Sequence, residues 1–267
     1  MRVLLLLVAA CGFHPQLAAD ATTGSGEGSD ATTGGTRYRK PLTLTVGSPA
    51  MLDDFVASII TIDPELAARA PDPGQIAFTA MDGTPLSREI VAYDPGTGAL
   101  EAWVRIPHVS DTITIYMTYG PGAPAEPMHV WDGYVAAWHF AEATGPWLDS
   151  AGGHAVAPPS TGQTATPSNA GIAGTAREFD GDDDCTSASA NDPTLNFGMG
   201  SFTIQAWVNV DESANGYDEV LFNGGDTGLP GYMFTLGGGS WFAYVSDGIE
   251  RHASFGLESA LLGPWNQ

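Results

Sequence analysis

Basic residues are scarce in this 267-residue chain, where nine Lys and Arg stand against 31 Asp and Glu and give a formal net charge of −22 at pH 7. A surface this acidic repels phosphate backbones and anionic lipid head groups, so we expect no nucleic-acid partner and some attraction for cations. Charged residues amount to only 15% of the chain. The polar remainder is mainly Gly, Ser, Thr, Asn and Asp, a composition typical of extracellular β-proteins.

Cysteine and long apolar runs are equally scarce. The two cysteines, Cys11 and Cys185, form no Cys-x-x-Cys pair, and no His-x-x-x-His spacing occurs, so no zinc site is indicated. No Gly-x-Ser-x-Gly or phosphate-binding loop is present either. The apolar run over 3–10 is far shorter than the roughly 20 residues of a membrane-spanning helix.

The N-terminus has the build of a secretory signal, with Arg2 before the apolar run and Cys11 after it. Val8-Ala9-Ala10-Cys11 resembles a bacterial lipobox, in which the cysteine becomes the lipidated first residue of the mature chain. An ordinary signal cleaved near Ala18-Ala19 is the alternative, and both imply export. We expect residues 1–11 to be a signal peptide, Cys11 to be lipidated, and the protein to lie at the outer membrane or cell surface, held by a lipid anchor only.

Residues 12–36 contain almost nothing apolar and predict a flexible Gly/Ser/Thr linker with a reach of about 25–30 Å. From residue 37 onward polar and apolar side chains alternate, as in RYRKPLTLTV, FVASIITI and TITIYMTY. Alternation of this kind predicts short half-buried strands, and turn sequences such as Asp82-Gly83 separate them. We expect an antiparallel β-sandwich over 37–130.

Four segments of this region, YRKPLTLTV, DGTPLSREI, EAWVRIP and TIYMTYGPG, resemble in this order the family called domain of unknown function 2341. That resemblance implies a β-fold in an exported or surface protein. No reaction is established for the family, so the resemblance implies no chemistry.

A second resemblance begins after the proline-rich joint at 121–127. WHF followed by LDSAGG, then EFDG, SFTIQAWV and a closing LGPW resemble the laminin-G-like jelly rolls of the concanavalin A-like lectin and glucanase superfamily, over about 131–267. In that family further strands follow the closing tryptophan, so we expect a C-terminally truncated domain. The predicted fold class is all-β, with two consecutive antiparallel β-sandwiches, the second an incomplete concanavalin A-like jelly roll.

The stretch REFDGDDDC, residues 177–185, allows three interpretations. It predicts a solvated turn between strands, because Asp-Gly favours tight turns. It also suits a calcium site with Asp180, Asp182 and Asp183 as ligands, and jelly rolls of this superfamily often hold calcium. The third interpretation is the start of the Glu-x-Asp-x-x-Glu motif of retaining glucanases at Glu178, although a glycine interrupts the motif.

Aromatic residues near the C-terminus offer a possible ligand site. Trp241 and Tyr244 are candidates for a sugar-stacking surface, and a place in the core is their alternative. Taken together, the sequence predicts a non-catalytic, lipid-anchored surface protein that displays a lectin-like module for carbohydrate or protein binding. A glycoside hydrolase and a purely structural module of a surface assembly are the alternatives.

Overall fold

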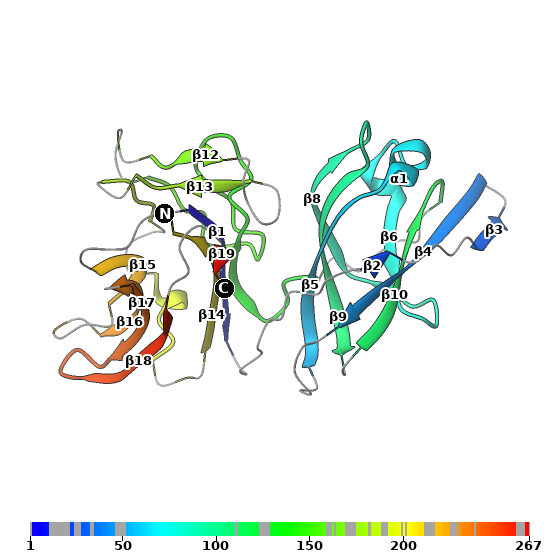
Figure 1. The fold of residues 1–267 in the computed structure, drawn as a ribbon. Helices are drawn as coiled ribbons and strands as arrows, with labels where there is room; N and C mark the ends of the chain where they lie inside the picture. Colours follow the sequence, from blue (N-terminus) through cyan, green and yellow to red (C-terminus); the bar gives the residue numbers. More distant parts are fainter. Residues whose placement is uncertain are drawn as a thin grey trace. The chain divides into compact units, whose positions relative to one another are not determined.

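The computed structural model describes residues 2–10, 22–23, 28–32, 35–45, 52–109, 112–122, 129–158, 162, 164–168, 175–180, 183–187, 192–198, 200, 202–210, 217–224, 228, 230–237, 239–259 and 265–266. The chain divides into two compact units. The first unit comprises His14–Asp132, and the second joins Met1–Phe13 to Gly133–Gln267. Both consist mainly of antiparallel strands (Figure 1), which confirms the all-β fold class.

The first unit contains two antiparallel sheets. One has the order β2-β4-β10-β6-β7, with β3 also paired to β4; the other has the order β5-β9-β8. The strands of the first sheet are β2 (Thr22–Thr23), β3 (Gly28–Thr32), β4 (Gly35–Thr45), β6 (Ile76–Thr79), β7 (Pro85–Leu86) and β10 (Thr112–Tyr119). Those of the second are β5 (Leu52–Ile62), β8 (Arg88–Asp94) and β9 (Ala99–Val109).

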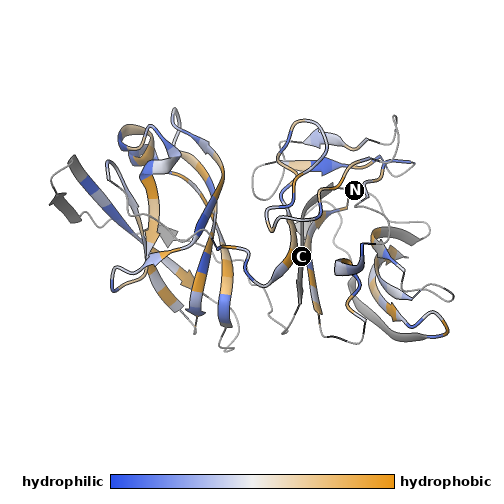
Figure 2. Ribbon diagram, turned by 180° about the vertical axis from the view of Figure 1, so that it is seen from behind, coloured by the Kyte–Doolittle hydropathy of each residue, from blue (hydrophilic) through white to orange (hydrophobic). Residues whose placement is uncertain are grey.

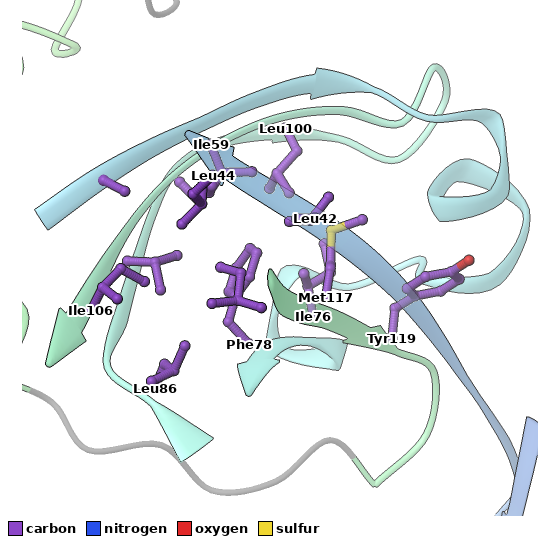
Figure 3. Close-up of a cluster of buried hydrophobic side chains, with 14 of the residues drawn as sticks. Leu42, Leu44, Ile59, Ile76, Phe78, Leu86, Leu100, Ile106, Met117 and Tyr119 are labelled. Atoms are coloured by element: carbon purple, nitrogen blue, oxygen red, sulfur yellow. The ribbon is translucent and has the colours of Figure 1, made fainter. Parts of the chain in front are cut away.

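The hydrophobic core of the first unit lies between these two sheets, as Figure 3 shows. Alternate residues of β4 and β9 enter it, among them Leu42, Leu44, Leu100 and Ile106, all at most 2% exposed. Full burial of one such side chain contributes roughly 1.5–3 kcal/mol. Apolar residues accordingly colour the strands of this unit more than its loops (Figure 2).

A short helix, α1 (Pro64–Arg69), adds Leu66 to this core. It begins after Asp63, whose side chain caps Glu65 N at 3.0 Å and contacts Lys40 Nζ at 2.6 Å. Gly98 packs against the start of this helix with a φ of +74°, and a Cβ there would lie 1.9 Å from Asp63 O. Only glycine fits this corner.

The segment predicted to be a flexible linker is described only in part. Where it is described, β2, β3 and the first residues of β4 form antiparallel pairs, with β3 running from Gly28↔Arg39 to Thr32↔Gly35. The remaining linker positions lie outside the described residues. Part of the expected tether is thus paired with the first sheet.

The second unit also contains two antiparallel sheets. One has the order β12-β13-β1-β14-β19, with β11 also paired to β1, and the other the order β15-β16-β17-β18. The first comprises β1 (Arg2–Ala10), β11 (Tyr134–Trp138), β12 (Thr166–Ser168), β13 (Ala176–Glu178), β14 (Phe202–Asn209) and β19 (Trp265–Asn266). The second comprises β15 (Tyr217–Asn223), β16 (Gly231–Gly237), β17 (Ser240–Ser246) and β18 (Arg251–Ser259).

The core of the second unit draws on both of its sheets. Trp138 and Val208 come from one sheet and Leu236 and Trp241 from the other, and all are less than 9% exposed. Trp241 stacks on Phe234, with ring centroids 5.2 Å apart and planes inclined by 8°. A two-sheet arrangement fits the predicted sandwich, whereas its jelly-roll identity stays a prediction.

The apolar segment predicted to be a signal peptide forms strand β1, inside the six-stranded sheet of the second unit. A run of uncharged apolar residues suits a strand with neighbours on both edges as well as it suits an export signal. Cys11 lies outside the described residues, so its lipidation stays a prediction. Within the described part of the chain, no helix is long and apolar enough to cross a bilayer.

Candidate functional site

The described part of the acidic stretch follows β13, and we call Asp180, Asp183 and Asp184 the acidic turn. Asp180 and Asp183 are exposed, and Asp184 is half-buried. Asp180 N donates to Asp184 Oδ2 at 3.0 Å, and Asp184 N lies 3.5 Å from Asp180 Oδ1. Carboxylate oxygens of Asp180, Asp183 and Asp184 all lie within 4.8 Å of one another. The structure thus brings together two of the three predicted calcium ligands and adds Asp184, while Asp182 lies outside the described residues.

The glucanase interpretation requires its acids on one strand, where the first Glu and the Asp two residues later face the same side. Strand β13 ends at Glu178, and Asp180 already belongs to the turn that follows. Glu178 and Asp180 therefore do not alternate along a strand. The described residues here lack the arrangement on which that alternative depends.

Trp241 and Tyr244 are both buried, with exposures of 7% and 6%. Trp241 belongs to the core, and Tyr244 lies opposite Met233, which is itself 8% exposed. Alternation along a strand predicts that one face of the strand is exposed to solvent, but here residues on both faces of β16 and β17 are buried. Neither ring offers an open face, which corrects the expectation of a sugar-stacking surface at these two positions.

A buried carboxylate that the sequence analysis did not single out organises the start of the second unit. The Asp149 side chain is 1% exposed, and both of its oxygens accept hydrogen bonds. The backbone donors and their distances are Ala137 N at 2.7 Å, Ala151 N at 2.9 Å, Gly153 N at 3.0 Å and His154 N at 3.0 Å. Because Ala137 belongs to β11, Asp149 ties this strand to the loop that follows it.

His154 extends this network across the unit. Its Nδ1 lies 3.1 Å from Asp149 Oδ2, and its Nε2 lies 2.6 Å from Thr194 Oγ1. Thr194 and Asp192 begin the short helix η2 (Pro193–Leu195). Hydrogen bonds from the Thr194 side chain and backbone hold the pKa of the Asp192 carboxyl below its usual range.

Asp149, His154 and Thr194 stand in the order of an acid, base and hydroxyl nucleophile. The Thr194 hydroxyl, however, donates to Asp192 Oδ1 at 2.5 Å. A hydroxyl that donates its hydrogen bond to Asp192 does not donate it to His154, whereas activation of a nucleophile by His154 would require that bond. The geometry therefore cross-links two loops instead of activating a nucleophile.

The sequence does carry a weak signal for this network. Asp149 is followed by Ser-Ala-Gly-Gly, and Asp before such residues favours a turn in which its side chain bonds nearby backbone N–H groups. The partnership of His154 with Thr194, 40 residues away, has no local signature.

The first unit also has a buried polar cluster, on the outer face of β9. Glu101 and Trp103 there are 7% and 2% exposed, although they alternate with core residues of the same strand. Trp131, in the chain segment 130–132, contacts Trp103 and Glu89 on this face. Trp131 lies 5.7 Å from Trp103 between ring centroids, and its Nε1 donates to Glu89 Oε2 at 2.5 Å.

Arg105 completes this arrangement, which we call the Trp131 clasp (Glu89, Trp103, Arg105 and residues 130–132). Its Nη1 donates to Val130 O at 3.1 Å and to Asp132 O at 2.6 Å. Burial, together with the negative charge of Glu89, raises the pKa of the neighbouring Glu101 carboxyl to about 8. Glu101 is thus a buried carboxyl group on the same strand as Trp103 and Arg105, and its proton is held more tightly than that of a free glutamate.

Comparisons with protein-family models, with curated proteins and with solved structures find no match for this chain. Both family resemblances therefore stay predictions that rest on the motifs themselves.

Proposed function

We propose that this chain is an exported, lipid-anchored surface protein whose second unit recognises a carbohydrate or protein ligand without converting it. The signal-like N-terminus ending at Cys11 supports export and anchoring. The motifs shared with domain of unknown function 2341 and with laminin-G-like jelly rolls support a surface location and a binding role. Localisation and ligand class are parts of this proposal.

The observation that supports a non-catalytic role is that the hydrogen bonds of the buried polar side chains go to other groups of the chain. Asp149 accepts backbone N–H groups, His154 bridges two loops, and the Thr194 hydroxyl is directed at Asp192. Each such group stabilises local structure. At the acidic turn, the end of β13 at Glu178 separates the acids that a retaining hydrolase would place on one strand.

Charge narrows the class of ligand. Residues 133–267 contain sixteen acidic and two basic residues, whereas residues 37–132 contain twelve and six. A surface with this balance disfavours anionic polymers and favours neutral glycans or basic protein surfaces. Calcium at the acidic turn would add positive charge to the second unit, and calcium binding is a part of the proposal.

Binding and hydrolysis can be separated in one set of measurements. The purified chain is applied to an array of neutral and acidic glycans, and release of reducing ends from β-glucans is followed in parallel. We expect saturable binding to neutral glycans, unchanged by Glu178→Gln, and no release of reducing ends. Release that Glu178→Gln abolishes would establish a hydrolase, and absence of binding to every glycan would contradict a carbohydrate ligand.

A further inference from the structure

His154 is a buried ring, and each of its two nitrogen atoms lies within hydrogen-bonding distance of an oxygen atom. Its side chain is 9% exposed. Among the described residues, the charged groups that face it are Asp149, in the loop after β11, and Asp192, at the start of η2. A neutral imidazole carries one N–H donor and one acceptor, whereas the imidazolium cation carries two donors. The direction of each hydrogen bond therefore decides the charge of the ring.

The hydrogen bond at Nδ1 runs from the ring to Asp149. Both oxygens of this carboxylate already accept backbone N–H groups, two at Oδ1 and two at Oδ2. An ionised carboxylate surrounded by donors in this way acts as an acceptor only. Nδ1, which lies 3.1 Å from Asp149 Oδ2, is therefore the donor of this bond.

The hydrogen bond at Nε2 also runs outward from the ring. The Thr194 hydroxyl donates its hydrogen to Asp192 Oδ1 at 2.5 Å. Hydrogen bonds from the Thr194 side chain and backbone hold the pKa of the Asp192 carboxyl below its usual range, so this carboxylate supplies no proton of its own at neutral pH. With its single hydrogen used there, the hydroxyl can only accept from the ring. Nε2, which lies 2.6 Å from Thr194 Oγ1 and 3.6 Å from Asp192 Oδ2, is therefore a donor as well.

Helix η2, to which the ring is bonded, is itself attached to the second sheet of this unit. Leu195 O accepts from Asn223 Nδ2 of β15 at 2.9 Å and from the Tyr232 hydroxyl of β16 at 3.0 Å. On the other side of the ring, Asp149 accepts a backbone N–H of β11, which belongs to the first sheet. His154 thus lies in a chain of hydrogen bonds that begins at one sheet of the second unit and ends at the other.

We propose that His154 is an imidazolium cation in the folded chain and forms a pH-sensitive tie between the two sheets of the second unit. With both ring nitrogens protonated, the hydrogen bonds to Asp149 and Thr194 form together, and the positive charge strengthens each of them. When rising pH removes one of these protons, the ring keeps a single donor, so one bond of the chain is lost. The attachment of η2 to the loop that contains Asp149 then weakens. This tie is independent of the proposed ligand and of export.

Nitrogen-15 NMR of the full chain tests the charge of the ring. The chain is labelled at its six histidines, and the resonances of His154 are identified by their loss in His154→Gln. We expect both ring nitrogens of His154 to carry protons at about pH 7, where a solvated histidine is mostly neutral. One of these protons should be lost at higher pH.

The pH dependence of stability tests the tie itself. Thr194 is exposed, so Thr194→Val removes the acceptor at Nε2 with little change in packing, and Thr194→Ser, which keeps the hydroxyl, is the matched control. In the unaltered chain, the melting temperature of the second unit should fall by about 2–6 °C between about pH 6 and about pH 9, as expected for the loss of one charge-assisted hydrogen bond. Thr194→Ser should keep this fall, and Thr194→Val should remove at least about half of it.

Two results overturn the inference. His154 could carry a single ring proton at about pH 7 while the second unit stays folded, which would assign a neutral ring. Alternatively, Thr194→Val could show the same fall in melting temperature as Thr194→Ser and the unaltered chain, which would separate that fall from this tie. Glycan binding and lipid labelling of Cys11 test the proposed function separately, and neither affects these two outcomes.

Discussion

The first unit buries a largely aliphatic core between its two sheets, with residues such as Leu42, Ile59 and Ile76 fully covered. The second unit relies more on aromatic residues, as in the stacked pair of Phe234 and Trp241, and on the buried carboxylate of Asp149. Aliphatic burial scales with area and needs no particular partner. A buried carboxylate is stable only while each of its hydrogen bonds is made.

This difference indicates how the stability of each unit changes with ligand, processing, metal and pH. The second unit depends on contacts that join distant segments, such as His154 to Thr194, and on a strand from the start of the chain. We therefore expect the stability of the second unit to change with ligand, processing and metal. The stability of the first unit should change mainly with pH, through the buried carboxyl group of Glu101.

The largest effect is expected for Asp149→Asn. The substitution points an amide NH₂ at backbone N–H donors and removes the charge that faces His154, so the second unit should lose about 3–5 kcal/mol. Two-transition calorimetry or urea unfolding would measure this loss. Asp72→Asn is the matched control, since Asp72 caps helix η1 (Pro73–Gln75) of the first unit from an exposed position. Asn caps nearly as well, so only a few tenths of a kcal/mol should be lost there. Equal losses in the two variants would refute the role given to Asp149.

A smaller and pH-dependent effect is expected for Glu101→Gln. The pKa of Glu101 is raised from 4.5 to about 8, so between these values the unfolded chain releases a proton that the folded chain keeps. The stability of the first unit should fall as pH rises from about 4.5 to about 8, by at most about 1.4 kcal/mol per pH unit.

Glutamine mimics the protonated carboxyl and should remove this slope, leaving the variant about 1–3 kcal/mol more stable than the unaltered chain at pH 8. Urea unfolding at several pH values would measure it. Glu250→Gln, at an exposed position of the second unit, serves as the control and should leave the slope in place. An unchanged slope in Glu101→Gln would contradict the assignment.

The smallest effect concerns calcium at the acidic turn. Weak binding raises stability only by mass action, so calcium at about ten times its dissociation constant should add about 1.4 kcal/mol to the second unit. Asp180→Asn should abolish the resulting rise in melting temperature, whereas Asp247→Asn, at a turn outside the cluster, should not. No change on adding calcium or chelator would remove calcium from the proposal.

Local patterns in the sequence predicted much of the fold. The alternation around Leu42 and Leu44 gave the inward face of β4 correctly. Asp82-Gly83 forms the expected turn, with Asp82 Oδ1 accepting from Thr84 N and Gly83 at a φ of +89°. These features depend on residues that are close together in the sequence, so the local pattern of residue types is enough to predict them.

The features that the sequence did not reveal depend on distant partners. Burial of Tyr244 requires knowledge of what covers the second face of its sheet. The network of His154 joins loops 40 residues apart, and β1 pairs with strands more than 120 residues away. Composition and periodicity describe a segment by itself, and they carry no information about such pairings.

Labelling of Cys11 tests the central claim most directly. The chain is expressed in a bacterium grown with an alkyne analogue of palmitate, together with Cys11→Ser and, as the matched thiol control, Cys185→Ser. The account predicts labelled protein in the membrane fraction for the unaltered chain and for Cys185→Ser only. The mass of the labelled protein should match a chain that begins at Cys11. Unlabelled protein that retains Met1 and sits in the soluble fraction would contradict it.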